Sequence, residues 1–238
     1  LDKLRKEFIA SVSHELKTPI SIIQGYAQGL VENVANEEDK NFYCEVIMEE
    51  SLKMDSLVKE LLLISQMESG YFKMDIEEIN FYPIIKDIKD KYSSKYKRIV
   101  YNGSKDIFVL CDEKYIERVL DNLVVNALKY SSGDRDVIIS AEDIGNKERI
   151  TVSNETDRLT ENDLDSIWTP FYRLDKVRDR DGHGLGLSIV RGILENHKSK
   201  FGVYFSEEKI VNFWFELAKK TDDIKDIYDD EEFEIEEA

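Results

Sequence analysis

Cysteine, positive charge and long apolar runs are all scarce in this sequence of 238 residues. The two cysteines, Cys44 and Cys111, lack the clustered spacing of a metal site, and we expect a reducing, cytoplasmic compartment. Lysine and arginine number 33 against 50 aspartates and glutamates, and the resulting net charge of −17 argues against a nucleic-acid partner. No apolar run is long enough to span a bilayer, and no signal peptide is recognisable.

The two ends of the sequence are unusual. The chain begins at Leu1, without Met, in a stretch that already has a helical pattern, so we expect a fragment of a longer protein. Residues 221–238 contain ten acidic residues and one lysine. We expect residues 219–238 to form an acidic, disordered tail that is solvated and keeps the chain soluble.

Apolar residues recur at three- and four-residue steps from Leu4 to Leu30, which predicts an amphipathic helix to about residue 33. A near-heptad pattern predicts a second helix over residues 38–68, and Gly70 ends it. Two helices of this length cannot bury their apolar stripes alone. Residues 1–70 are therefore predicted to form an antiparallel helical hairpin that dimerises into a four-helix bundle.

The pattern changes after Gly70, where short β-like runs alternate with helical stretches. This alternation, with a terminal hairpin, predicts an α/β sandwich over residues 71–218. The fold class is thus two-domain, an all-α helical hairpin followed by an α/β sandwich. We expect strands at 98–103, 107–112, 136–143 and 149–155, helices at 115–131 and 186–197, and a hairpin at 200–208 and 210–217.

The stretch "ASVSHELKTPIS" contains His14. At about 100° per residue, His14 lies about 200° from Val12, away from the apolar stripe. Thr18, four residues on, shares its face, and the carboxylate of Glu15 is adjacent. With no second His or Cys nearby, a metal ligand is disfavoured. An exposed imidazole that a carboxylate orients is instead a candidate nucleophile. Pro19 is expected to bend the helix just beyond.

Two further strings carry candidate binding residues. In "DNLVVNALKYS", Asn122 and Asn126 share one helical face, and their amide oxygens suit a hydrated Mg²⁺. Lys129 is placed to meet a phosphate and Tyr130 to pack on adenine, although this string alone also fits a helix with solvated asparagines. In "DGHGLGLSIVRGILE", three glycines precede a helix, an arrangement that lets backbone N–H groups approach phosphates. No strand precedes them, which disfavours a dinucleotide fingerprint. These glycines are Gly182, Gly184 and Gly186.

Taken together, these strings resemble the boxes of sensor histidine kinases. Residues 8–20 are similar to the H-box pattern F-x-x-x-x-S-H-E-L-K-T-P-[IL] throughout. "DNLVVNALKYS" resembles the N-box, "IWTPFYRLDK" the F-box and "DGHGLGLSIVRGILE" the G2 box. The resemblance covers about residues 3–217. It implies a HisKA dimerisation domain and a GHKL-type ATP-binding domain of a bacterial two-component system.

The resemblance also implies roles. His14 accepts the γ-phosphoryl group of ATP with Mg²⁺, Glu15 acts as general base or orienting carboxylate, and Thr18 positions water for the reverse, phosphatase reaction. The partner is the receiver domain of a response regulator, whose Asp takes the phosphoryl group. The parent protein is expected in the cell membrane, with this part facing the cytoplasm. The further residues expected at the nucleotide are Phe171 and Tyr172 on a lid, Arg173 at a phosphate or docking the lid, and Leu185 and Leu187 between and after the G2 glycines.

One box departs from the family. Where the G1 box has Asp-x-Gly-x-Gly, this sequence has Asn154, Thr156 and Arg158. The Asn154 oxygen is still able to accept a hydrogen bond from the adenine amino group, but the lost glycines restrict the loop. We therefore expect weaker ATP binding or a differently placed loop.

Three hypotheses about the function follow from these motifs. The first is an autophosphorylating kinase, in cis or in trans within its dimer. The second is a phosphatase-biased or nucleotide-sensing signalling dimer, suggested by the altered G1 loop. The third is a non-kinase ATPase of the wider superfamily, against which the H-box argues. We assign no chemistry to His183, and we expect His197 to be a surface or capping residue.

Overall fold

The computed structural model describes residues 2–34, 36, 38–70, 72–92, 98–132, 135–174, 182–207 and 209–220. The chain divides into two compact units. We call the first, Leu1–Phe72 together with Asp165–Gly192, the hairpin unit. We call the second, Lys73–Leu164 together with Ile193–Ala238, the sheet unit. The predicted domain limits at residues 70 and 218 stay a prediction, and the division assigns residues 165–192 to the same unit as the hairpin.

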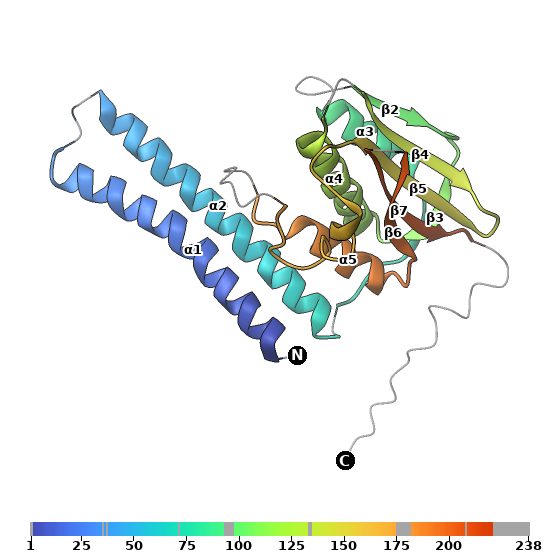
Figure 1. The fold of residues 1–238 in the computed structure, drawn as a ribbon, viewed down its shortest axis with the longest axis horizontal. Helices are drawn as coiled ribbons and strands as arrows, with labels where there is room; N and C mark the ends of the chain where they lie inside the picture. The colour runs from blue at the N-terminus through green and yellow to red at the C-terminus, as the bar shows by residue number, and fades with distance from the viewer. Residues whose placement is uncertain are drawn as a thin grey trace, which may run out of the picture. The chain divides into compact units, whose positions relative to one another are not determined.

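The hairpin unit is built on two long helices, α1 (Asp2–Val31) and α2 (Asp39–Glu68), which run antiparallel (Figure 1). α1 continues through Pro19, and α2 ends just before Gly70, whose φ of 74° favours glycine. Near the connection, the rings of Tyr26 and Tyr43 meet edge to face with their centroids 4.9 Å apart. Both helices agree closely with the sequence prediction.

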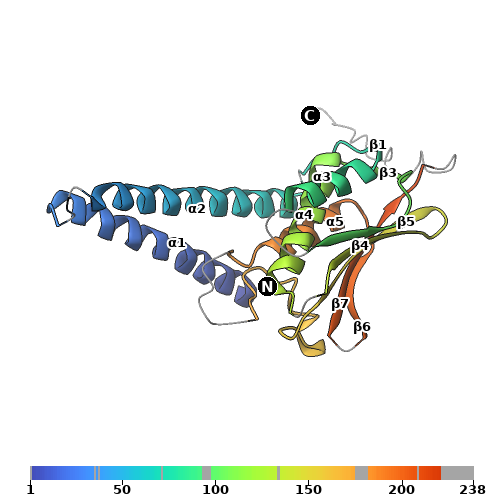
Figure 2. The same ribbon diagram turned by 90° about the horizontal axis from the view of Figure 1, so that it is seen from above.

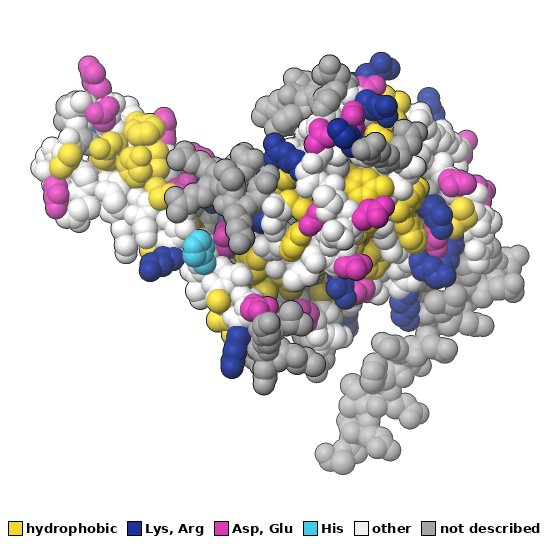
Figure 3. Space-filling model, viewed as in Figure 1, with side chains coloured by type: hydrophobic (Ala, Val, Ile, Leu, Met, Phe, Trp, Pro, Cys, Tyr) yellow, Lys and Arg dark blue, Asp and Glu magenta, His cyan; other side chains and the backbone are white. Residues whose placement is uncertain are grey.

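These helices bury little apolar surface within the chain. In α2 the buried side chains lie in its second half, at Leu57, Leu63, Ile64 and Met67. Figure 3 shows hydrophobic side chains on the surface near the closed end of the hairpin. The exposed large apolar residues of the two helices are Ile9, Ile20, Val31, Phe42, Met48, Leu52, Val58 and Leu62.

The sheet unit contains a mixed sheet in the order β1-β3-β7-β5-β4-β2, with β6 paired to β7 off this path. β2 and β4 pair in parallel and every other pair is antiparallel. The terminal hairpin of β6 and β7 was predicted and is confirmed. The strands are β1 (Glu77–Asn80), β2 (Ile99–Asn102), β3 (Phe108–Cys111), β4 (Val137–Asp143), β5 (Lys147–Glu155), β6 (Phe201–Glu207) and β7 (Ile210–Ala218).

Two helices, α3 (Tyr82–Tyr92) and α4 (Glu113–Tyr130), lie on one face of this sheet (Figure 2). Burial alternates along β5, where every second residue from Glu148 to Asn154 is buried. The core contains Phe81 and Phe215, both fully buried, whose rings meet edge to face. The remaining elements are the short 3-10 helix η1 (Glu161–Asp163) and α5 (Gly186–Asn196), the last of which contributes to both units.

The predicted fold class, a helical hairpin followed by an α/β domain, is confirmed, with β1, α3 and the short η1 missed. β1 has only four residues, and its first two are exposed glutamates, so it carries no alternating apolar signal. α3 contains Pro83 in its first turn, where the missing N–H costs no intrahelical bond. Most of the predicted acidic tail lies outside the described residues. The exceptions are Lys219, which pairs with Asp143 and Glu148, and Lys220, which pairs with Glu78.

Candidate functional site

His14 lies on an exposed stretch of α1 in the hairpin unit. Its side chain is 81% exposed, which confirms that it faces away from the core. The Nδ1 atom lies 3.8 Å from Oε1 of Glu15, whose side chain is 26% exposed. Because this carboxylate is on the Nδ1 side of the ring, Nε2 is the nitrogen left to react. His14 therefore combines solvent access with a carboxylate that can orient its ring.

Thr18 lies one turn after His14, and its side chain is exposed. Its hydroxyl donates to the carbonyl oxygen of His14 at 3.5 Å, a long bond within the helix. An O–H held this weakly is able to rotate toward a water molecule. Thr18 thus shares the face of His14, as its spacing predicted.

The second part of the hairpin unit carries the aromatic and glycine strings. The backbone N–H of Phe171 donates to the carbonyl oxygen of Gly184 at 2.9 Å, which joins the two strings. Gly184 has a φ of 74°, and a Cβ at this position would lie 3.0 Å from the carbonyl oxygen of Tyr172. Glycine is therefore required here for both conformation and space. The ring of Phe171 packs against that of Phe8 in α1, with the centroids 5.5 Å apart.

His183, to which the sequence analysis assigned no chemistry, lies close to Glu15. Its Nδ1 atom lies 3.4 Å from Oε2 of Glu15, and its side chain is 21% exposed. Nothing in the sequence marks this contact, because the two residues are separated by most of the chain. The carboxylate of Glu15 consequently has an imidazole near each of its two oxygens.

In the sheet unit, α4 carries the predicted metal ligands. The Nδ2 of Asn122 donates to the carbonyl oxygen of Arg118 at 2.8 Å, so its Oδ1 is the atom left for a ligand. Asn126 is half-buried one turn further along the same face. Carboxamide oxygens are ligands that Mg²⁺ accepts, and the donor set fits this ion. At the end of the helix, Nζ of Lys129 lies 5.2 Å from the ring centre of Tyr130.

The altered G1 segment follows β5. Asn154 is buried, and its Nδ2 donates to the carbonyl oxygen of Glu155 at 3.2 Å, which leaves Oδ1 as the acceptor. Thr156 is also buried, and its hydroxyl accepts a hydrogen bond from the backbone N–H of Arg158 at 3.2 Å. The backbone N–H of Thr156 donates to the carbonyl oxygen of Lys209 at 2.7 Å. These hydrogen bonds hold the turn in one conformation, whereas the glycines that the family has at these positions would leave its backbone freer.

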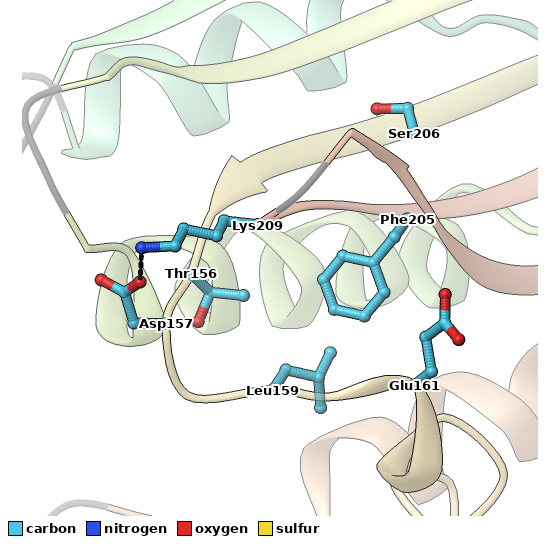
Figure 4. A pocket seen from close by; sticks show the side chains of 7 residues that line it. All are labelled: Thr156, Asp157, Leu159, Glu161, Phe205, Ser206 and Lys209. Carbon is cyan, nitrogen blue, oxygen red and sulfur yellow. Dashed lines mark ion pairs between the residues drawn. The ribbon is translucent and has the colours of Figure 1, made fainter.

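A hollow of about 450 Å³ opens beside this turn, between residues 156–161 and the β6–β7 connection (Figure 4). Phe205 and Leu159 form its apolar wall. Asp157 and Lys209 form an ion pair of 2.6 Å at one side. Neither Asn122 nor Asn126 lines this hollow, so it is separate from the predicted metal ligands.

The third histidine, His197, is buried, so the surface position was wrong, whereas its contact with the last turn of α5 agrees with the capping role expected as the alternative. Its Nδ1 contacts the carbonyl oxygen of Ile193 at 2.9 Å, and its Nε2 accepts from the N–H of Asp112 at 3.1 Å. Burial lowers the pKa of His197 below its ordinary value. Asp112 in turn caps α4 by accepting from the N–H of Tyr115. His197 is therefore a neutral structural residue that fixes the start of α4.

The predicted site residues divide between the two units. Within the part of the chain that the structure describes, no group of three His, Cys, Asp or Glu residues is arranged to hold a metal ion. Over the same residues, no helix has the length and hydropathy needed to span a membrane. The hairpin unit holds His14, Glu15, Thr18, Phe171, Tyr172, Arg173 and residues 182–187; the sheet unit holds Asn122, Asn126, Lys129, Tyr130 and Asn154.

Two family models match the chain. Residues 4–70 match the His Kinase A (phospho-acceptor) domain. Residues 111–221 match the family described as histidine kinase-, DNA gyrase B- and HSP90-like ATPase. The two matches contain all the residues predicted for phosphoryl acceptance and nucleotide binding.

The proteins similar to this chain are described as sensor proteins and histidine kinases. The sensor protein SrrB of Staphylococcus aureus (strain N315) is 29% identical over 92% of this chain, which spans 39% of that relative's length. The catalytic domain of the histidine kinase ThkA is 30% identical and covers 61% of this chain and 97% of its own, with a TM-score of 0.55. ThkA in complex with the response regulator protein TrrA is 28% identical and covers 90% of this chain and 61% of its own, with a TM-score of 0.69.

Proposed function

Because the chain belongs to the sensor histidine kinases, we propose that it binds ATP and transfers the γ-phosphoryl group to His14. The observation that carries this proposal is the exposed imidazole of His14 with the carboxylate of Glu15 on its Nδ1 side. A reacting nitrogen must be reachable by a large phosphorylated substrate, and a side chain that is 81% exposed meets this requirement.

The chemistry follows from the orientation of the ring. With a proton on Nδ1 facing Glu15, the lone pair of Nε2 attacks the γ-phosphorus in line with the leaving oxygen. A P–N bond forms, the bond from the γ-phosphorus to the bridging oxygen breaks, and ADP leaves. The Nδ1 proton moves to the Glu15 carboxylate, so that the product is a neutral phosphoramidate ring.

The nucleotide is bound by residues of the segments that resemble the N-box, F-box and G2 box, and of the G1 segment. Asn122 and Asn126 supply oxygens for Mg²⁺, which neutralises phosphate charge when it is bound. Lys129 contacts a phosphate, Tyr130 packs on adenine, and Oδ1 of Asn154 accepts from the adenine amino group. The G2 glycines and adjacent leucines approach the phosphates through their backbone, with Phe171, Tyr172 and Arg173 over the nucleotide.

The phosphoryl group is then passed to an aspartate of a response regulator. The complex of ThkA with TrrA supports this partner class, since the chain resembles that kinase over most of its length. Thr18, on the face of His14, positions water for the reverse, phosphatase reaction. The membrane attachment of the parent protein is part of the same proposal, because the SrrB relative is a sensor protein and this chain spans 39% of it.

The chain acts as a homodimer through its helices. Ile9, Ile20 and Val31 recur at 11-residue intervals, which is about three helical turns, so they share one exposed stripe of α1. Leu52 and Leu62 are exposed on α2 in the same hairpin. Apolar stripes of this length are stable in water when a second copy covers them, and a four-helix bundle achieves this.

Labelling with γ-labelled ATP and Mg²⁺ tests the kinase proposal. Wild-type chain should acquire an acid-labile, base-stable label, and His14→Ala should acquire none. Ser21→Ala is the matched control, since Ser21 is exposed two turns along the same face, and it should label normally. Equal labelling of wild type and His14→Ala would refute the assignment. Asn126→Ala should lose labelling while remaining dimeric; full labelling would refute its role at Mg²⁺.

A phosphatase-biased signalling dimer is the second candidate, favoured by the buried turn at Thr156 in place of the family's glycines. Titration calorimetry with an ATP analogue separates the two. Weak binding combined with slow labelling supports this candidate, whereas tight binding with rapid labelling removes it. Asn154→Ala should weaken binding about tenfold, because one hydrogen bond to the adenine amino group is lost.

A further inference from the structure

Glu15 lies between two imidazoles in the hairpin unit. Its Oε1 atom is 3.8 Å from Nδ1 of His14, and its Oε2 atom is 3.4 Å from Nδ1 of His183. Each oxygen therefore has its own imidazole, and the two contacts do not compete for one atom. This arrangement brings together a residue of the H-box and a residue of the G2 box that the mechanism above does not use.

The backbone that follows His183 is held by packing and by a hydrogen bond. The flanking glycines, Gly182 and Gly184, both have positive φ, at 100° and 74°. Gly184 packs against the backbone of Phe171 and Tyr172, and the next residue, Leu185, is buried. These contacts hold the backbone that follows His183, and the imidazole attached to it lies beside the carboxylate of Glu15.

Glu15 needs such a partner. A glutamate side chain has several rotatable bonds, and holding it in one rotamer costs conformational entropy. Only 26% of this side chain is exposed, so solvent supplies few alternative hydrogen bonds. A donor on Oε2 restricts the carboxylate while Oε1 stays directed toward the reacting ring. Orientation of a catalytic group within a fraction of an ångström has a direct effect on rate.

We propose that His183 is a positioning residue: its Nδ1–H donates to Oε2 of Glu15 and thereby directs Oε1 to Nδ1 of His14. The inference rests on the proposed function, since it assigns a second residue to the base of that reaction. It makes transfer to His14 depend on the placement of residues 182–187, which carry the G2 glycines.

Kinetics of His14 labelling on the full chain test this inference. His183→Ala should lower the rate at saturating ATP about 3- to 10-fold and leave KM for ATP unchanged. His183→Asn should restore most of the rate, because the amide nitrogen of Asn occupies the position of Nδ1 and donates to the same oxygen. Binding of an ATP analogue by each variant confirms that it is folded.

A double-mutant cycle identifies the route of the effect. In a Glu15→Gln background, His183→Ala should cause little further loss if it acts through Glu15. Three outcomes would each overturn the inference: a labelling rate that falls by the same factor in both backgrounds, a rise in KM alone, or a faster rate in His183→Ala. These outcomes differ from the absence of label in the wild-type chain, which would overturn the proposed function itself.

Discussion

In the hairpin unit, Ile9, Val31 and Leu62 stand exposed on long helices, whereas in the sheet unit Phe81 and Phe215 are fully buried. His14 and His197 follow the same division, since the side chain of His14 is 81% exposed and His197 is 3% exposed. The long helices of the hairpin unit keep several apolar side chains and His14 accessible, whereas the sheet unit encloses Phe81, Phe215 and His197. Within one chain, packing therefore stabilises mainly the sheet unit, and the stability of the helical hairpin depends on a second molecule that covers its exposed apolar residues.

The largest expected effect is on the core of the sheet unit. Phe215→Ala removes a buried ring that meets Phe81 edge to face, and it should lower the free energy of unfolding by about 3–5 kcal/mol. Urea denaturation followed by tryptophan fluorescence measures this loss, because Trp214 is adjacent in the chain. A loss below about 1 kcal/mol would show that the sheet unit is no better packed than the hairpin.

The next effect concerns the exposed apolar residues of α2 in the hairpin. Leu52→Asp combined with Leu62→Asp should raise the dimer dissociation constant about 100-fold or more, because each buried leucine contributes about 1.5–3 kcal/mol. Light scattering across a concentration series measures the change. Phe108→Asp is the matched control, since Phe108 is equally an exposed apolar residue but lies in the sheet unit. A dimer that survives the double change would contradict the proposed interface.

A smaller effect is expected from the buried histidine. Since burial lowers the folded pKa of His197, the unfolded chain takes up the proton first as the pH falls. The stability contribution is complete above the unfolded pKa of about 6.5 and is lost as the pH decreases toward the folded value. Unfolding of wild type should therefore become easier as the pH falls below about 6.5.

His197→Gln is the control for this pH dependence. The amide oxygen of Gln is able to accept from the N–H of Asp112 near the position of Nε2, and it does not titrate. The variant should cost about 1–3 kcal/mol at neutral pH, because the contact with Ile193 is disturbed, and it should show a flatter pH profile. If both proteins lose stability equally over this window, other groups are responsible.

The same division explains what the sequence predicted well. The exposure of His14 followed from helical periodicity, because a face of α1 is determined by residues only a few positions apart. The fold class and the β6–β7 hairpin followed from local patterns in the same way. The burial of His197 and the contact of Glu15 with His183 depend on segments far apart in the chain. No local spacing encodes them, and both were therefore missed.

The smallest effects come from one substitution made in each unit. In the hairpin unit, a Cβ at Gly25 meets nothing within 4 Å, and alanine favours helix. Gly25→Ala should therefore stabilise α1 by about 0.5–1 kcal/mol. In the sheet unit, a Cβ at Gly202 would lie 2.9 Å from Nε1 of Trp214, so the indole must move.

Gly202→Ala should consequently destabilise the sheet unit by about 1 kcal/mol, despite the entropy it gains in the unfolded chain. The Cζ atom of Arg149 lies 4.7 Å from the ring centre of Trp214, and displacement of the indole weakens this cation–π contact. Thermal unfolding gives the two signs, and the emission maximum of tryptophan should shift for Gly202→Ala alone. Destabilisation by both substitutions would mean that a Cβ is crowded at Gly25 as well as at Gly202, and stabilisation by both would mean that it is crowded at neither. Either result would contradict the difference in packing between the two positions.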